Sequence, residues 1–146
     1  MKLLDVNVWL ALVLSGHAFH DAVRRWFVAQ RLDGTLLFCR STQQSLLRLL
    51  TTSAVLGRFG NPPLTNAEAW QVYQGLLGDS RVAYAAEPQD LEQHWQRLAV
   101  RDNASPKIWM DAYLAAFAMT SGSQLVTIDA AFRQYEGLDL ALLTRP

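Results

Sequence analysis

Three aspartates stand at positions where an acid needs a physical reason. Asp5 and Asp129 each end a short apolar run, and Asp111 lies inside the apolar segment 108–118. A carboxylate on an apolar face needs a partner or a metal ion, because its burial without compensation is costly. Three oxygen donors without histidine or cysteine suit Mg²⁺ or Mn²⁺ rather than zinc. Such ions bind phosphate oxygens and activate water, so this set predicts hydrolysis of a phosphodiester.

Each acid also has a simpler interpretation. Asp5 and Asp129 could cap the helices that follow them, because aspartate is among the best N-cap residues. Asp111 could pair with Lys107, one turn earlier in the same helix. That pair has the weaker of the two orientations, and such pairs stabilise a helix by only ~0.2–0.5 kcal/mol. The metal interpretation is therefore stronger for Asp111 than for the other two acids.

The elements that must position these acids are short strands alternating with helices. We expect strands at 2–4, 35–39, 82–85, 124–128 and 138–142, and helices at 6–14, 18–32, 41–50, 65–77, 88–98, 105–120 and 130–134. The 65–77 helix begins with a capping box at Thr65 and Glu68. This alternation predicts an α/β layer fold with a largely parallel sheet. Sites in such sheets form beyond the carboxyl ends of the strands, which places Asp5 and Asp129 at one edge.

Composition restricts the class of protein. The 146 residues are 51% hydrophobic and 18% charged, which predicts one globular domain over 1–146 and excludes a disordered chain. The formal net charge of zero excludes a strongly basic nucleic-acid coat, although local basic residues can still bind phosphates. Cys39 is the only cysteine, so no intrachain disulfide forms. The sequence contains no signal peptide or membrane span, and we expect a cytoplasmic protein with no membrane partner.

Three motifs give the chain a resemblance to a known family. The segments LLDVNVWLAL, WMDAYLAAFA and LVTIDAAF occur in this order and carry Asp5, Asp111 and Asp129. They resemble the PIN-domain family and, within it, the VapC toxin ribonucleases of bacterial toxin–antitoxin pairs, over nearly the whole chain. The resemblance implies a PIN-like three-layer α/β/α fold with a central sheet of short strands. It also implies that these three acids are metal ligands and catalytic residues.

Four further residues take roles from this resemblance or from their positions. The family's second acid, usually a glutamate, corresponds to Gln43, an amide that brings oxygen but no negative charge. Asn7 and Thr127 could hold metal-bound waters, and Thr127 also suits a strand as a β-branched residue. Arg48 could position the acids or a phosphate, or could simply be a solvated helix arginine. We include Gln43 among the catalytic candidates.

The resemblance implies a Mg²⁺-dependent endoribonuclease toxin, with Mn²⁺ as the other possible ion. Its substrate would be structured or single-stranded RNA, such as tRNA or rRNA loops, and a cognate VapB-like antitoxin would neutralise it. A homodimer is expected. Gln43 supports an alternative, a catalytically weakened or inactive relative that binds RNA or a protein partner. A receiver-like domain is a remote third option, because neither Asp79 nor Asp90 follows a mid-chain strand as a phospho-acceptor would.

The remaining chemically notable residues have mostly structural interpretations. The histidines lack the spacing of a metal motif, and we assign them no metal role. We expect core positions for three tryptophans on apolar stripes, Trp9, Trp26 and Trp70. Four basic residues could form a phosphate-binding rim or could simply be solubilising charges: Arg40, Arg48, Arg101 and Lys107.

Overall fold

The computed structural model describes all residues, 1–146, and is built on one five-stranded sheet. The strand order is β3-β2-β1-β4-β5, and every neighbouring pair is parallel, as the alternation of strands and helices predicts. Each strand has only three or four residues. The strands are β1 (Lys2–Leu4), β2 (Leu36–Phe38), β3 (Val82–Tyr84), β4 (Gln124–Thr127) and β5 (Leu140–Leu142).

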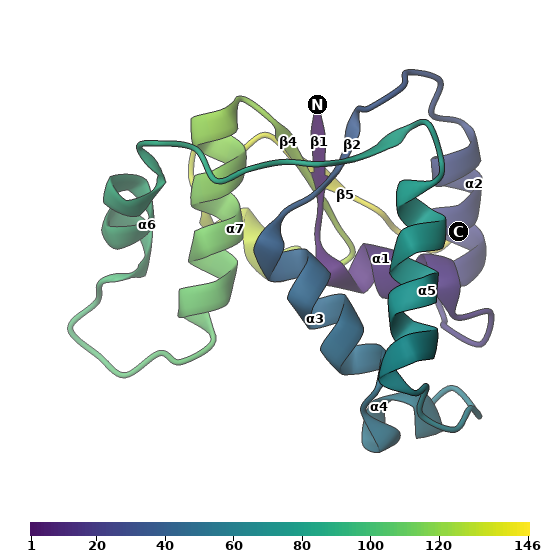
Figure 1. Cartoon of the computed structure of the whole chain (residues 1–146). Helices are drawn as coiled ribbons and strands as arrows, with labels where there is room; N and C mark the ends of the chain where they lie inside the picture. The colour runs from purple at the N-terminus through teal and green to yellow at the C-terminus, as the bar shows by residue number, and fades with distance from the viewer.

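Helices cover both faces of this sheet and make the three-layer α/β/α fold. Figure 1 shows α6 and α7 on one side, with α1, α2 and α5 on the other. The helices are α1 (Val6–Val13), α2 (His20–Val28), α3 (Arg40–Leu50), α4 (Ser53–Gly57), α5 (Asn66–Leu77), α6 (Leu91–Ala99), α7 (Ile108–Ser121) and the 3₁₀ turn η1 (Ala130–Gln134). None of them is long and apolar enough to cross a membrane.

The two faces of the sheet belong to two separate apolar cores. Leu3 and Leu4 are both fully buried, but they face opposite ways because side chains alternate along a strand. Leu3 packs in the core beneath α6 and α7, whereas Leu4 packs in the core beneath α1, α2, α3 and α5. A strand buried on both faces has no polar alternation, which explains why apolar residues stand next to one another in every strand, as at Leu3-Leu4 of β1 and Leu125-Val126 of β4.

Helix α7 brings its acid to the carboxyl edge of the sheet through a tight reversal. The helix ends at Gly122, whose φ of 65° lies in the left-handed region that glycine adopts without strain. Ser123 then donates its backbone N–H to the Ala118 carbonyl at 2.9 Å, and β4 begins one residue later. Because α7 runs antiparallel to β4, its first turn lies beside the carboxyl ends of the strands. Asp111 is in that first turn.

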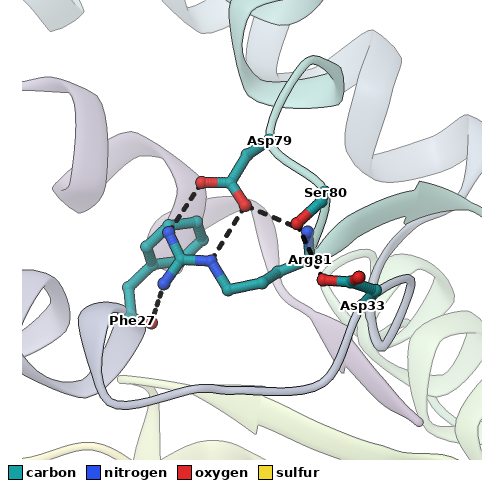
Figure 2. A network of polar contacts seen from close by, with 5 residues as sticks. All are labelled: Phe27, Asp33, Asp79, Ser80 and Arg81. Carbon is teal, nitrogen blue, oxygen red and sulfur yellow. Dashed lines mark hydrogen bonds and ion pairs between the residues drawn. The ribbon is translucent and has the colours of Figure 1, made fainter.

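A polar network far from the acids fastens the start of β3 to the end of α2 (Figure 2). Arg81 forms two side-chain bonds to Asp79, at 2.8 and 2.6 Å, and donates to the Phe27 carbonyl at 2.8 Å. Its guanidinium also lies 4.2 Å from the centroid of the Phe27 ring. Ser80 donates to Asp33 at 2.7 Å, in the turn that leads into β2. The hydrogen bonds to Arg81 lower the pKa of Asp79 to about 2.

Several sequence-based predictions differ from the structure in their details. Helix α4 was not expected, and α2 spans only His20–Val28 of the predicted 18–32. Helix α7 begins at Ile108, because 105–108 form a separate turn in which the Ile108 N–H donates to the Ser105 carbonyl. The core assignment of Trp70 is wrong, since 46% of this residue is exposed.

Other predictions are confirmed. Trp9 is fully buried, and Trp26 packs at the edge of the core beneath α1. The predicted capping box is formed, with Thr65 Oγ1 accepting from the Glu68 N–H at 3.1 Å and the Glu68 carboxylate accepting from the Thr65 N–H at 2.8 Å. These two reciprocal bonds satisfy otherwise unpaired donors at the start of α5.

Candidate active site

Asp5 is the most deeply placed of the three predicted acids. It sits between the end of β1 and the start of α1, and only 5% of the residue is exposed. Its side chain makes no capping bond to α1, although its backbone position is that of the N-cap. The pKa of Asp5 is raised from 3.8 to about 6, chiefly by burial and to a smaller extent by the charges of Asp111 and Asp129, while the hydrogen bond from Thr127 opposes the rise. Capping therefore does not explain this carboxylate.

Thr127 joins the ends of the two central strands through its hydroxyl group. This fully buried residue donates from Oγ1 to Asp5 Oδ2 at 2.7 Å and accepts from the Asp129 N–H at 3.0 Å. The Asn7 amide donates to the same hydroxyl at 3.3 Å, and Asn7 Oδ1 accepts from the Ile128 N–H at 3.4 Å. The two polar residues predicted beside the acids thus orient Asp5 and the turn that carries Asp129.

Asp111 and Asp129 approach the same region from α7 and from the end of β4. Burial raises the pKa of Asp111, the charge of Asp129 raises it further, and Lys107 lowers it by a smaller amount. Asp129 is exposed, and its carboxylate caps η1 by accepting from the Ala131 N–H at 2.9 Å. The capping interpretation of Asp129 is therefore correct, and it leaves the second carboxylate oxygen available for another role.

No cationic side chain forms an ion pair with any of the three acids. The ion pair between Arg81 and Asp79 is the only one in the chain, and it lies elsewhere. The acids therefore form a set of hard oxygen donors that repel one another, which is the chemistry that a divalent cation relieves. As the side chains lie, no three acidic, histidine or cysteine groups converge closely enough to ligate one ion directly. That arrangement fits a divalent ion that keeps several of its waters and takes one or two carboxylates as direct ligands.

Gln43 makes no hydrogen bond to any of the three acids. This residue is 5% exposed, and it lies on the buried face of α3 with Leu46 and Leu50. Its Oε1 accepts from the Arg40 guanidinium, and its side chain also hydrogen-bonds the Tyr73 hydroxyl group. The exposed face of α3 carries Arg48 instead.

The other predicted basic residues are spread over separate elements. Arg40 lies over the Tyr84 ring at 4.9 Å from its centroid, and Arg101 donates to Gln134 at 3.0 Å. Lys107 precedes α7 and is exposed. Arg40 and Arg48 share one hollow at α3, whereas Arg101 and Lys107 do not line it. The predicted four-residue rim is thus divided.

Comparison with known proteins assigns the family. The PIN-domain model matches residues 2–138. Ribonuclease VapC41 of Mycobacterium tuberculosis is 56% identical over 146 residues, which cover 99% of this chain and 100% of that protein. The chain belongs to the PIN-domain family and, within it, to the VapC ribonucleases.

Solved structures of PIN-domain proteins share this fold at low sequence identity. VapC20 of Mycobacterium tuberculosis, described as a sarcin–ricin loop cleaving toxin, has a TM-score of 0.66 at 21% identity, with all of both chains covered. A toxin–antitoxin complex from Klebsiella pneumoniae has a TM-score of 0.58 at 13% identity, covering 97% of this chain and 96% of that one. The predicted PIN-like architecture is therefore confirmed.

One polar residue of this PIN domain beside the acids was missed by sequence reasoning. Tyr135 is 6% exposed, and its buried hydroxyl group has no hydrogen-bond partner. Its pKa is raised to about 12, chiefly by burial and to a smaller extent by the charge of Asp111, while Arg101 opposes the rise. It lies just after η1, where no periodic pattern marks it. Only the packing of η1 against the α7 side of the sheet brings it near Asp111.

Proposed function

We propose that this protein is a Mg²⁺-dependent endoribonuclease toxin that cleaves structured or single-stranded RNA, such as tRNA or rRNA loops. The observation that carries the proposal is the buried Asp5 carboxylate, held near two further acids, none of which forms an ion pair with a basic side chain. The 56% identity to Ribonuclease VapC41 over the whole chain supports the same activity. Mn²⁺ is the alternative ion, because it favours the same oxygen donors.

Asp5, Asp111 and Asp129 would hold the ion, in part through its waters. A bound divalent ion neutralises the scissile phosphate and lowers the pKa of water. Thr127 keeps the Asp5 carboxylate oriented through its 2.7 Å bond, and Asn7 holds the turn between β4 and η1. Arg48, on the exposed face of α3, would bind a phosphate of the RNA.

A cognate VapB-like antitoxin would neutralise the enzyme. The fold is shared with the toxin–antitoxin complex from Klebsiella pneumoniae, which supports a partner of this kind. A basic side chain of the antitoxin could take the electrostatic place of the ion among the acids. We also propose a homodimer. Co-expression with the antitoxin and light scattering of the purified protein test these two partners separately.

The test of the activity is RNA cleavage by the purified protein. Wild-type protein should cut a loop-containing RNA with Mg²⁺ or Mn²⁺ and stop when EDTA is added. Asp5→Asn and Asp111→Asn should abolish cleavage and relieve growth arrest on expression. Asp21→Asn is the matched control, because Asp21 is an exposed acid on α2. Full activity in both site variants would overturn the proposed mechanism.

A second function is favoured by one observation on α3. Gln43 brings no charge and is already bonded to Arg40 and Tyr73, which leaves the site with three acids. A PIN relative that binds RNA or a protein without cutting RNA would fit a site that lacks the fourth acid. Calorimetry separates the two functions, because the non-catalytic protein would bind RNA but show no Mg²⁺ or Mn²⁺ binding. Gln43→Glu should then strengthen metal binding if position 43 can reach the ion.

A further inference from the structure

A hollow of about 610 Å³ lies between α3 and the pair of helices α6 and α7. One wall is the exposed face of α3, with Arg40, Gln44 and Arg48. The opposite wall comes from α6 and α7, with Trp95 and Met110. None of the three acids lines this hollow, but Met110, which does, directly precedes Asp111 in α7. We call it the α3–α7 cleft, and its volume lies within the range of small-ligand pockets.

The aromatic wall of this cleft is held rigidly. Trp95 donates its indole N–H to the Trp109 carbonyl at 2.9 Å, which fixes the ring. The Tyr113 ring stands edge-on to Trp95, with centroids 5.6 Å apart and planes at 86°. Tyr113 in turn donates its hydroxyl to Glu87 at 2.9 Å. Rings fixed in advance lose little conformational entropy when a flat ligand packs against them.

The other wall of the cleft is cationic and rich in donors. Arg48 is exposed, and its guanidinium makes no hydrogen bond or ion pair within the chain. Arg40 lies against Tyr84 and donates to the buried Gln43. Glu87 is the only acid that lines the cleft. The excess of positive charge suits an anionic ligand rather than an apolar peptide, which would leave the arginines and amides of α3 facing apolar atoms.

We propose that the α3–α7 cleft binds an unpaired nucleobase of RNA next to the phosphate that is cut. The base packs against Trp95 and Tyr113, and its neighbouring phosphates contact Arg48 and Arg40. This inference rests on the proposed ribonuclease function and adds a base-binding subsite to it. Aromatic side chains beside a positively charged groove are the usual means of holding single-stranded nucleic acid. Stacking tolerates any base, and the Glu87 carboxylate favours one that presents an N–H edge.

The test is binding of a single-stranded RNA decamer that carries 2-aminopurine at its centre, measured without divalent ions. Trp95→Ala should weaken binding about 5- to 150-fold, the value of one base–aromatic stack. It should also remove the quenching of 2-aminopurine fluorescence that stacking produces in the wild type. Trp95→Phe keeps an aromatic ring and should retain part of the affinity and part of the quenching. Trp70→Ala is the matched control, because this exposed tryptophan of α5 does not line the cleft.

A second variant tests the cationic wall without touching the core. Arg48→Ala should weaken RNA binding. It should also reduce the slope of log K against log salt concentration by about one, because one phosphate contact is lost. Arg24→Ala, an exposed arginine of α2 outside the cleft, should do neither. If Trp95→Ala fails to give the wild-type circular dichroism spectrum, Trp95→Phe and Arg48→Ala decide the question.

Unchanged RNA affinity in a folded Trp95→Ala or in Arg48→Ala overturns the proposal. If Trp95→Ala instead loses only its inhibition by co-expressed antitoxin, the cleft belongs to the protein partner, and the base-binding assignment is wrong. Cleavage by Asp5→Asn reports on the proposed ribonuclease function alone. The two hypotheses can therefore fail separately, because RNA binding is measured here without any requirement for cutting.

Discussion

Replacing Asp5 by asparagine should make the metal-free protein more stable while it destroys the proposed activity. At neutral pH the fold holds a charged carboxylate that is almost entirely buried and has two other acids nearby. Asparagine has nearly the same shape, and its Oδ1 can still accept the hydrogen bond from Thr127. The substitution therefore removes the unfavourable charge and keeps the contact. A residue retained for chemistry rather than stability behaves in this way.

The size of the effect follows from the raised pKa. The shift from 3.8 to about 6 for Asp5 corresponds to about 3 kcal/mol at neutral pH, at 1.36 kcal/mol per pKa unit. We take this as an upper bound, because local relaxation and water reduce the cost of buried charge. A gain of roughly 1–3 kcal/mol raises Tm by roughly 3–9 °C in a chain of this size.

The stability difference between Asp5→Asn and the wild type should depend on pH in a defined direction. Because the folded pKa of Asp5 lies above the unfolded value, the destabilisation is complete above about pH 6. It declines as the pH falls from about 6 to 3.8, since the folded state then takes up the proton first. At about pH 4.5 the difference between Asp5→Asn and wild type should be about a third of its value at about pH 7.5.

The assay is urea unfolding followed by circular dichroism in EDTA, at both pH values, with Asp21→Asn as control. Adding Mg²⁺ should then stabilise the wild type more than Asp5→Asn, because ligand binding to the folded state adds RT ln(1 + [L]/Kd). An Asp5→Asn protein that is no more stable than wild type at neutral pH would refute the reasoning. So would a stability difference that stays constant between the two pH values.

Three other substitutions test separate parts of the structure. Thr127→Val removes the hydrogen-bond donor to Asp5, so the pKa of the Asp5 carboxyl group should rise further and metal-dependent cleavage should fall about 10–100-fold. An Asp5 titration by NMR that does not change in this variant would contradict the prediction. Arg81→Met should cost roughly 1–2 kcal/mol in urea unfolding, because it breaks a two-bond ion pair and a backbone contact, and should leave RNA cleavage intact. Tyr135→Phe removes a buried hydroxyl group without a partner and should raise the unfolding free energy by up to about 1 kcal/mol, and a loss of stability would reveal an unrecognised bond.

Local patterns predicted the layer architecture because each element carries its own signal. Short apolar runs that alternate with helical patterns are typical of strands buried on both faces, and the capping box at Thr65 marks a helix start by direct hydrogen bonding. The three acids stood out because charge is costly among apolar residues. Asp5 and Asp129 were placed at one edge by the rule for parallel strands, and the structure brings both near Asp111.

Side-chain directions on α3 depended on tertiary packing. Gln43 shares its helix face with Leu46 and Leu50, at spacings of three and seven, so the apolar stripe itself already pointed this amide inward. Sequence reasoning placed Gln43 by its alignment with a glutamate and overlooked that stripe. Trp70 was misplaced for a related reason: Ala69 and Tyr73 form the buried line of α5, and Trp70 lies at its margin.

Features made by distant segments left no local pattern at all. The α3–α7 cleft depends on how α6 and α7 stand relative to α3, and its walls come from residues 40–48 and 87–113. The hydroxyl of Tyr135 nears Asp111 only because η1 folds against the α7 side of the sheet. Such sites require the full tertiary arrangement, since neither helical nor strand periodicity encodes them.

The central pairing of β1 with β4 also bears on how the protein is made. Residues 2–4 must wait for residues 124–126 before their backbone groups pair on that side. At roughly 5–20 residues per second, the ribosome takes roughly 6–25 s between Asp5 and Asp129. Until then the first acid has neither its Thr127 hydrogen bond nor its neighbouring carboxylates. A nascent chain thus carries no assembled acidic site until the ribosome has made the segment from Gln124 to Asp129.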